Sequence, residues 1–318
     1  MTKYVLRRLL VSIPLLLGIT IIIFILADAM PGDALTAMVT DEAPIAGEVL
    51  AERRSQLGLD KSLPVRYLIW VGQLLRGNMG YSFITSVPIA ETVLRRIPPT
   101  LELMGVSLLI SIIIGLVLGI LSALKQYSVF DYLLTVLGFI GLSIPVFFLG
   151  MTLIYIFSLR LDWLPTSGMG TAAADFSLAD NLRHLILPAL SLAILRTAVF
   201  MRYTRASVLD VLGSDYLRTA RAKGIKERLV VGRHALRNAM IPIITIIGLN
   251  LPVLFGGAVI IETIFQWPGI GLLYITAVNQ RDHPMIMGLA LVSSIVVLAS
   301  NLLTDITYAF ADPRIRYE

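Results

Sequence analysis

Long uncharged apolar runs recur along the chain and alternate with polar segments. Each run is long enough to cross the hydrocarbon core of a bilayer, which takes about 20 residues in a helix. The run near residues 185–205 is the weakest, because Arg196 and Arg202 interrupt it and Pro188 lies near its start. The pattern predicts an all-α polytopic membrane protein with about six transmembrane helices. The expected spans are residues 9–29, 101–124, 132–159, 185–205, 238–262 and 284–308.

The composition supports a membrane protein and excludes several other classes. Of the 318 residues, 57% are hydrophobic and 15% are charged, and the mean hydropathy is +0.83. Soluble proteins average about 25% charged residues. So few charges could not cover so apolar a chain in water. The composition therefore excludes an ordinary cytosolic enzyme, a disordered protein and a collagen-like fibre.

The first apolar run has the flanks of a signal peptide, with basic residues before it and Ala27-Asp28-Ala29 after it. The apolar core of a signal peptide is about 7 to 15 residues long, and this run is longer. We therefore expect a retained helix, with cleavage as the alternative.

The distribution of basic residues predicts the topology. If the N-terminus is inside, the cytoplasmic segments hold 15 Lys and Arg residues, whereas the short external connections 160–184 and 263–283 hold three. Basic residues near span ends collect on the cytoplasmic side. We expect both termini in the cytoplasm, and this bias also accounts for the net charge of +5 without a nucleic-acid partner. The cytoplasmic segments are residues 1–8, 125–131, 202–238 and 312–318.

The external segment 30–100 is too long to be a simple connection. It contains an amphipathic run near Leu63–Leu75 and closes with Pro98 and Pro99. Short helices on the membrane surface suit this pattern better than a folded domain. We expect the segment to receive an external partner. The aromatic candidates for that contact are Tyr67, Trp70 and Tyr81, with anchoring of the segment at the headgroups as the alternative.

The cytoplasmic loop 206–237 contains a candidate docking site. Ala220 and Ala222 favour a short helix, and Gly224 would end it in a left-handed cap. The small side chains allow a close approach, and the arginines supply charged contacts. Docking of a cytoplasmic protein is one interpretation, and binding to anionic lipid is the other. The candidate contact residues are Asp215, Tyr216, Arg218, Thr219, Ala220, Arg221, Ala222, Lys223 and Gly224.

Ionisable residues in or near spans are candidates for the transport pathway or its gates. Asp28, Glu102 and Glu262 fall at external span ends under the expected topology. They could form an acidic mouth that attracts an amine or a metal cation, or they could be solvated in the headgroup layer. Arg196 lies deeper, where it could meet a substrate carboxylate or pair with a carboxylate or carbonyl on a neighbouring helix.

Several kinds of chemistry have no motif in the sequence. The chain has no cysteine, and its three histidines are not in a paired spacing, so we expect no metal site. No phosphate-binding P-loop motif is present, so any ATP must be hydrolysed by another chain. No catalytic pair lies inside a span, and we expect no enzymatic activity.

Gly115 and Gly119 form a G-x-x-x-G pattern that permits close helix packing.

The loop Asp215–Gly224 resembles the coupling loop of ABC-importer permeases, in the variant of peptide and nickel uptake systems. Only Ala220 and Gly224 match the general importer consensus, and the subgroup shares this departure. Asn78 stands where the family usually has Asp. Peptide and nickel uptake systems contain two types of permease, and this chain resembles the first type. Further matching segments are Leu57–Pro64, Gly77–Ser82, His184–Ala189, Trp267–Gly271 and Asp312–Arg316.

The resemblance implies a type I ABC importer permease fold like that of methionine importers, in the plasma membrane of a bacterium or archaeon. It also implies a second homologous permease, two cytoplasmic ATPase subunits that bind ATP and Mg, and an external binding protein. The expected solutes are di- or oligopeptides, with nickel complexes or glutathione as alternatives. A secondary transporter is a less favoured alternative, since inverted repeats and charge pairs inside the membrane are not evident.

Overall fold

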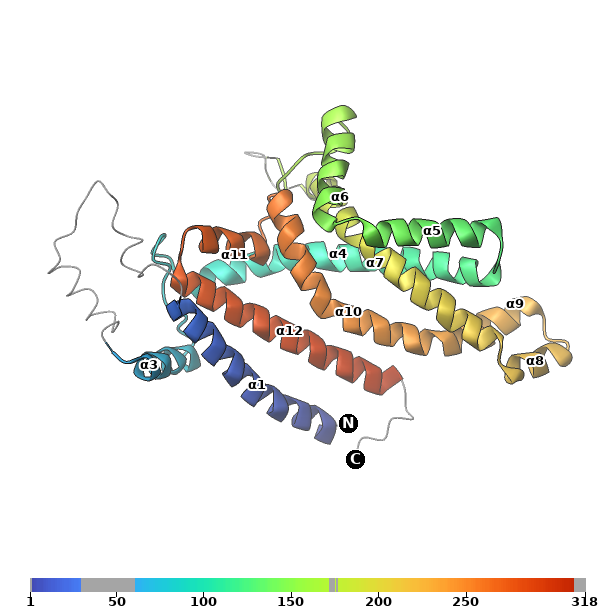
Figure 1. Cartoon of the computed structure of the whole chain (residues 1–318), viewed down its shortest axis with the longest axis horizontal. Helices are drawn as coiled ribbons and strands as arrows, with labels where there is room; N and C mark the ends of the chain where they lie inside the picture. The colour runs from blue at the N-terminus through green and yellow to red at the C-terminus, as the bar shows by residue number, and fades with distance from the viewer. Residues whose placement is uncertain (1, 30–60, 172–174, 176, 312–318) are drawn as a thin grey trace. The chain divides into compact units, whose positions relative to one another are not determined.

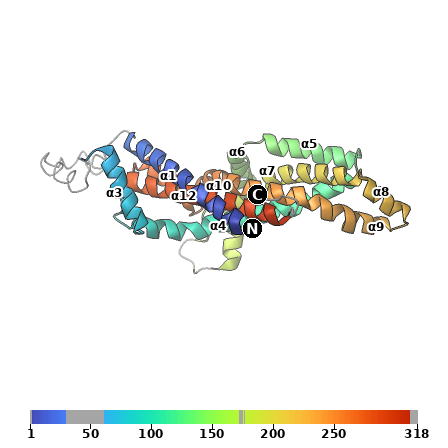
Figure 2. The ribbon, with the colours of Figure 1, turned by 90° about the horizontal axis from the view of Figure 1, so that it is seen from below.

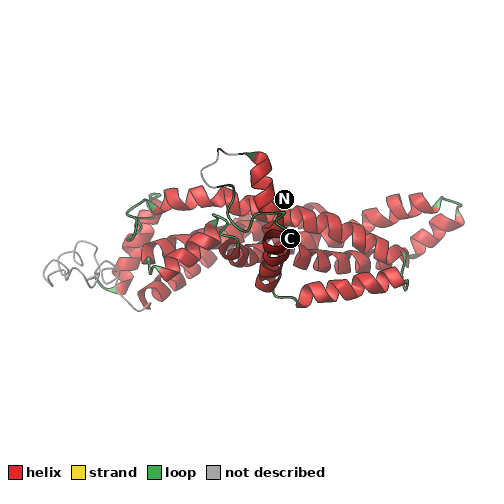
Figure 3. Cartoon of the chain, turned by 90° about the horizontal axis from the view of Figure 1, so that it is seen from above, coloured by secondary structure: helices red, strands yellow, loops and turns green. Residues whose placement is uncertain are grey.

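The computed structural model describes residues 2–29, 61–171, 175 and 177–311. In this part of the chain nearly all regular structure is helical (Figure 3), apart from an isolated bridge between Tyr81 and Pro88. The expected all-α fold is confirmed. The helices, labelled as in Figure 1, are α1 (Thr2–Ala29), α3 (Leu63–Leu75), α4 (Ile89–Leu124), α5 (Val129–Ser143), α6 (Val146–Leu153), the π-helix η1 (Ile154–Arg160), α7 (Leu178–Leu212), α8 (Asp215–Ala222), α9 (Glu227–Leu229), the π-helix η2 (Val230–Ala235), α10 (Leu236–Ile264), α11 (Ile270–Asn279) and α12 (His283–Ala311).

The chain divides into two compact units. The first contains Thr100–Trp267 together with the end segments Met1–Val5 and Ala299–Glu318. The second contains Leu6–Pro99 and Pro268–Leu298. Helices α5 to α10 therefore belong to the first unit, and α3 and α11 belong to the second.

Four helices in the described residues are long and apolar enough to cross a membrane, and two bent helix pairs raise the number to as many as six. The four are the whole of α4 and α7 and most of α1 and α12. The bent pairs are Val129–Ser143 with Val146–Arg160, and Glu227–Met240 with Pro242–Gly248. These segments overlap all the expected spans.

The expected span at residues 132–159 is not one continuous helix. It consists of α5, α6 and η1, and the chain bends by 102° where α5 meets α6. Pro145 lies at the bend and has no N–H to donate, and its ring disfavours helical geometry at the preceding residue. Ile144 accordingly has extended dihedral angles, with φ −79° and ψ 123°.

Helix α4 begins earlier than the sequence pattern suggested. We expected it from residue 101, after two consecutive prolines, but it runs without interruption from Ile89 through Pro98 and Pro99. Ile89 anchors this start, because its side chain is fully buried and its N–H donates to the Gly80 carbonyl at 3.0 Å. The connection 263–283, which we expected to be external, also contains a helix that we did not expect, the apolar α11.

Helix α7 is central to the first unit, where it packs against α5, α6 and α10 (Figures 1 and 2). It supplies Leu185, Leu187, Ala189 and Leu192 to the main buried cluster. Helix α10 and the turn after it supply the other side of that cluster. Those residues are Ala258, Ile261, Phe265 and Trp267.

The G-x-x-x-G pattern of α4 faces α7 and brings the two helices close together. A Cβ atom on Gly119 would lie 2.6 Å from both the Met201 carbonyl oxygen and the Thr204 Cβ. A Cβ atom on Gly115 would lie 2.7 Å from the Phe200 Cβ. These distances leave no room for a side chain, so glycine sets the spacing between the helices.

In the second unit, α3 packs on α1 through polar and aromatic contacts. The Tyr67 hydroxyl lies 3.0 Å from the Thr20 hydroxyl, and the Phe24 ring lies 5.6 Å from the Tyr67 ring and 5.7 Å from the Trp70 ring. The predicted amphipathic helix at Leu63–Leu75 is thus confirmed as α3. Residues 30–60 lie outside the described part of the chain.

We predict that Gly119→Ala destabilises the fold by about 1 to 3 kcal/mol, because the methyl group meets the backbone of α7. Gly105→Ala is the matched control on the same helix, since nothing lies within 4 Å of its Cβ position. Thermal unfolding of the detergent-solubilised protein should show a lower midpoint for the first variant and an equal or higher midpoint for the second. Equal midpoints would contradict the close packing.

Candidate functional site

The predicted docking loop forms the short helix α8, and its sequence supports both ends of that helix. Asp215 lies in the first turn and Arg221 lies in the last. Each charge is of the sign that the helix dipole favours at that end. Ala220 and Ala222, on either side of Arg221, cost little conformational entropy in a helix.

Gly224 ends α8 in the left-handed cap that the sequence predicted. Its φ is +73°, its N–H donates to the Arg221 carbonyl at 2.9 Å, and the N–H of Ile225 donates to the Ala220 carbonyl at 3.3 Å. This pair of hydrogen bonds is a Schellman motif. Nothing lies within 4 Å of the Cβ position of Gly224, so the chain itself leaves that side of the glycine open.

Leu217 anchors α8 to the rest of the first unit, a role that we did not predict from the sequence. It is fully buried with Val230 and Ala235, which belong to the π-helix η2. Ala220 and Ile225 pack against the same cluster. The residues of the predicted site other than Ala220 are exposed. The helix therefore buries one side against its own chain and presents the other.

Two side-chain contacts hold α8 to the segments that follow it. Arg221 donates from Nη2 to Glu227 Oε1 at 2.9 Å and from Nε to Oε2 at 3.1 Å. The hydrogen bonds that Arg221 donates to this carboxylate raise the pKa of Arg221 further above its ordinary value. Asn238 of α10 donates to the Tyr216 hydroxyl at 2.9 Å. A force on α8 therefore reaches both α9 and α10.

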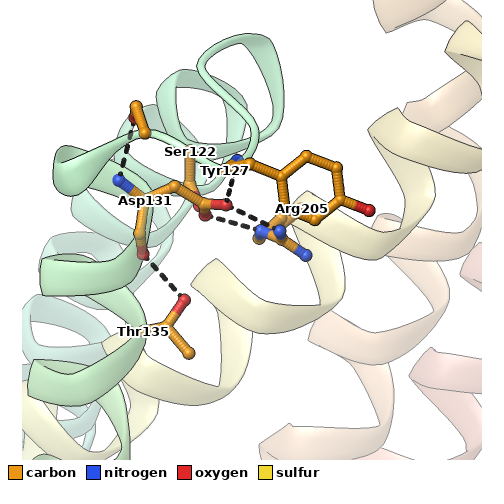
Figure 4. Close-up of polar contacts among 6 residues, drawn as sticks. Ser122, Tyr127, Asp131, Thr135 and Arg205 are labelled. Carbon is orange, nitrogen blue, oxygen red and sulfur yellow. Dashed lines mark hydrogen bonds and ion pairs between the residues drawn. The ribbon is translucent and has the colours of Figure 1, made fainter.

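An ion pair between a buried carboxylate and a partly exposed arginine joins α5 to α7 near the end of α7 that leads into α8 (Figure 4). Arg205 donates from Nε and Nη2 to the two carboxylate oxygens of Asp131, each at 2.8 Å. The N–H of Tyr127 donates to the same carboxylate at 3.1 Å, and the Ser122 hydroxyl also donates to it. The Asp131 side chain is only 3% exposed. This network ties the end of α4, the following turn and α5 to α7.

The sequence contained a usable signal for this ion pair, although we did not draw on it. Asp131 is in the first turn of α5, three residues after Ser128, which caps that helix by accepting from the Asp131 N–H at 3.2 Å. Arg205 falls at the end of the next predicted span, 185–205, on the same predicted side of the membrane as Asp131. Opposite charges at the same end of adjacent spans are candidates for pairing.

The three acidic pathway candidates differ in their contacts and exposure. Asp28, in the second unit, forms an ion pair with Arg66 at 2.6 Å. Glu262 is fully buried and accepts a hydrogen bond from the Thr100 hydroxyl at 2.7 Å. Glu102 is half-buried. Their contribution to an acidic mouth stays a prediction.

Arg196, the basic pathway candidate, contacts a side chain that the sequence reasoning missed. Its Nη1 donates to Asn250 Oδ1 of α10 at 2.8 Å. Asn250 in turn donates its amide to the Ile246 carbonyl at 2.8 Å. Arg196 thus meets a neutral amide oxygen on a neighbouring helix, where we expected a carboxylate or a backbone carbonyl.

The aromatic candidates that we expected on the external side differ in their exposure. Tyr67 and Trp70 are half-buried against α1, whereas Tyr81 is 60% exposed. Tyr81 follows a turn in which Asn78 Oδ1 accepts from the Gly80 N–H at 2.9 Å. An aspartate would supply the same acceptor, so Asn78 can fill this position in the turn where the motif resemblance predicts Asp.

Among the described residues, no group of three or more Asp, Glu, His or Cys side chains is arranged to hold a metal ion.

Comparison with known proteins gives matches over nearly the whole chain. The family described as "binding-protein-dependent transport system inner membrane component" matches residues 115–317, and the corresponding N-terminal family matches residues 1–104. The oligopeptide transport system permease protein AppB of Bacillus subtilis is 45% identical, with 100% of both chains covered. The glutathione transport system permease protein GsiC of Salmonella typhimurium is 40% identical, also with 100% of both covered.

A solved structure with the same fold is the MetNI methionine ABC transporter in an inward-facing conformation. The TM-score is 0.51 at 14% identity, and the match covers 68% of this chain and 95% of the other. This likeness supports the fold that the sequence predicted.

We predict that Asp131→Asn destabilises the fold by about 1 to 3 kcal/mol, because the partly exposed Arg205 guanidinium loses its carboxylate partner. Asp131→Asn combined with Arg205→Gln should cost less than Asp131→Asn alone, since no unpaired charge is left. Thermal unfolding of the two variants in detergent tests this. A double variant that is less stable than the single one would argue against a coupled pair.

Proposed function

Because the chain belongs to the inner-membrane components of binding-protein-dependent transport systems, we propose that it is the transmembrane subunit of an ATP-driven importer for di- or oligopeptides or related small solutes. The observation that carries the proposal is the full-length likeness to oligopeptide and glutathione permeases. The family and the several apolar helices make it a multi-pass protein of the inner membrane.

In this proposal the chain forms half of the translocation pathway and a second homologous permease forms the other half. A binding protein delivers the solute from outside. Two cytoplasmic ATPase subunits bind ATP and Mg and hydrolyse the ATP, so this chain needs no catalytic site or cofactor of its own. ATP binding can switch the pathway only if it favours one of two arrangements of the spans.

The exposed side of α8 is the proposed contact with an ATPase subunit. Movement of α8 passes to α10 through Tyr216 and Asn238, and to α9 through Arg221 and Glu227. Helix α7 leads directly into α8, and the pair of Asp131 and Arg205 connects α7 to α5. These contacts make the cytoplasmic ends of the spans follow α8.

The solute class has alternatives within the same transporter type. Glutathione is one, since a glutathione permease is 40% identical over the whole chain. Nickel complexes are another, on the motif resemblance alone. A secondary transporter is the less favoured alternative from another class, and it would not bring ATPase subunits with it. Co-purification of the tagged chain distinguishes these classes.

We predict that both termini are cytoplasmic, which places residue 170 outside and residue 226 inside. The chain has no cysteine, so single-cysteine variants Gly170→Cys and Lys226→Cys need no prior removal. Both positions are exposed. A membrane-impermeant maleimide added to intact cells should label the first variant and not the second. Labelling in the opposite pattern would reverse the topology.

We also predict that Gly224→Trp abolishes uptake while the amount of protein in the membrane stays normal. Gly224→Ala is the matched control, because both variants bear the backbone cost of a left-handed residue, about 1 to 2 kcal/mol. The chain leaves space beside this position, so the additional loss with Trp must come from a partner surface. Equal uptake by the two variants would count against docking of α8.

A further inference from the structure

Arg196 lies near the middle of α7, between Leu178 and Leu212. At 1.5 Å per residue it is roughly 25 Å from either end of the helix. A cation at such a depth is costly in a bilayer and faces the interior of the protein or a water-filled space. A functional role is the first hypothesis to consider for such a residue.

The surroundings of Arg196 leave its positive charge uncompensated within the described part of this chain. Its hydrogen-bond partner there is the neutral oxygen of Asn250, at 2.8 Å. The amide of Asn250 is held by the Ile246 carbonyl, which fixes the oxygen toward Arg196. A guanidinium group has five N–H donors, and this contact uses one of them.

The other arginines of α7 have different surroundings. Arg205 is paired with the buried carboxylate of Asp131. Arg183 donates to the Trp163 carbonyl at 3.3 Å, and Arg202 is exposed and lies over the Tyr203 ring. The combination of depth in the helix, partial burial and a neutral side-chain partner therefore distinguishes Arg196 from the other arginines of α7.

We propose that Arg196, oriented by Asn250, is a carboxylate-binding subsite on the translocation pathway. The inference rests on the proposed function, since the di- or oligopeptides and glutathione considered there carry at least one carboxylate at neutral pH. The planar fork of a guanidinium matches a carboxylate with two parallel hydrogen bonds. Asn250 holds the fork in place without neutralising it, so the charge stays available to the passing solute.

The test uses the complete transporter, with both permeases, the ATPase subunits and the binding protein, in proteoliposomes. The probes are radiolabelled trialanine and its C-terminal amide, each at a concentration that saturates the binding protein. The wild-type transporter should take up the free acid about tenfold faster than the amide, as expected for a hydrogen bond to a charged group. In Arg196→Gln uptake of the acid should fall about tenfold, to the rate of the amide.

Two further variants separate binding from packing. Asn250→Asp places a fixed carboxylate beside Arg196, so it should keep or raise the thermal stability yet lower uptake of trialanine. Arg202→Gln is the matched control on the same helix and should transport at the wild-type rate. ATP hydrolysis stimulated by the loaded binding protein should stay within about twofold of wild type in Arg196→Gln, which shows that the variant assembles.

The outcomes separate this inference from the function it rests on. Failure of the wild-type transporter to take up trialanine would contradict the proposed solute class, and the subsite with it. Wild-type uptake together with normal uptake by Arg196→Gln or Asn250→Asp would overturn the subsite alone. An equal fall for the acid and the amide in Arg196→Gln would instead assign Arg196 a structural role, for example in pairing with a carboxylate of the second permease.

Discussion

A polar group in the hydrocarbon core must find its partner within the protein, and the contacts of α7 reflect this constraint. Arg205 donates a bidentate pair of hydrogen bonds to the carboxylate of Asp131. Arg196 meets the amide oxygen of Asn250. The two glycines of α4 bring that helix close against the same α7. In the first unit, α7 therefore packs against several helices. Near its C-terminal end, just before the chain enters α8, the pair of Arg205 and Asp131 connects it to α5.

The features that local patterns determine could be read from the sequence. Apolar runs of span length correspond to α1, α4, α7 and α12 because a helix is the way to satisfy the backbone in lipid. The cap at Gly224 and the amphipathic α3 also depend on near neighbours alone, and both are present. The likeness to known permeases then confirmed the fold and the family.

The features that depend on distant residues were not predictable in the same way. Asp131 and Arg205 are 74 residues apart, and Arg196 and Asn250 are 54 residues apart, so no local period connects them. Leu217 looked like one apolar residue in a polar loop until the structure placed it against Val230 and Ala235. Pro145 marked an interruption, but a proline alone does not specify an angle, so the 102° bend between two helices that both pack on α7 could not be read from it.

That bend has a consequence for the order of membrane assembly. Each of its arms has 15 residues, and 15 residues of helix are roughly 22 Å long, which is short of the ~30 Å hydrocarbon core. The backbone at the bend therefore requires cover from protein rather than lipid. Helices α7 and α10, which pack against α6, are made later by the ribosome. The bent segment is thus synthesised before the helices that cover it. It reaches its final geometry late in biogenesis, once α7 and α10 have been inserted.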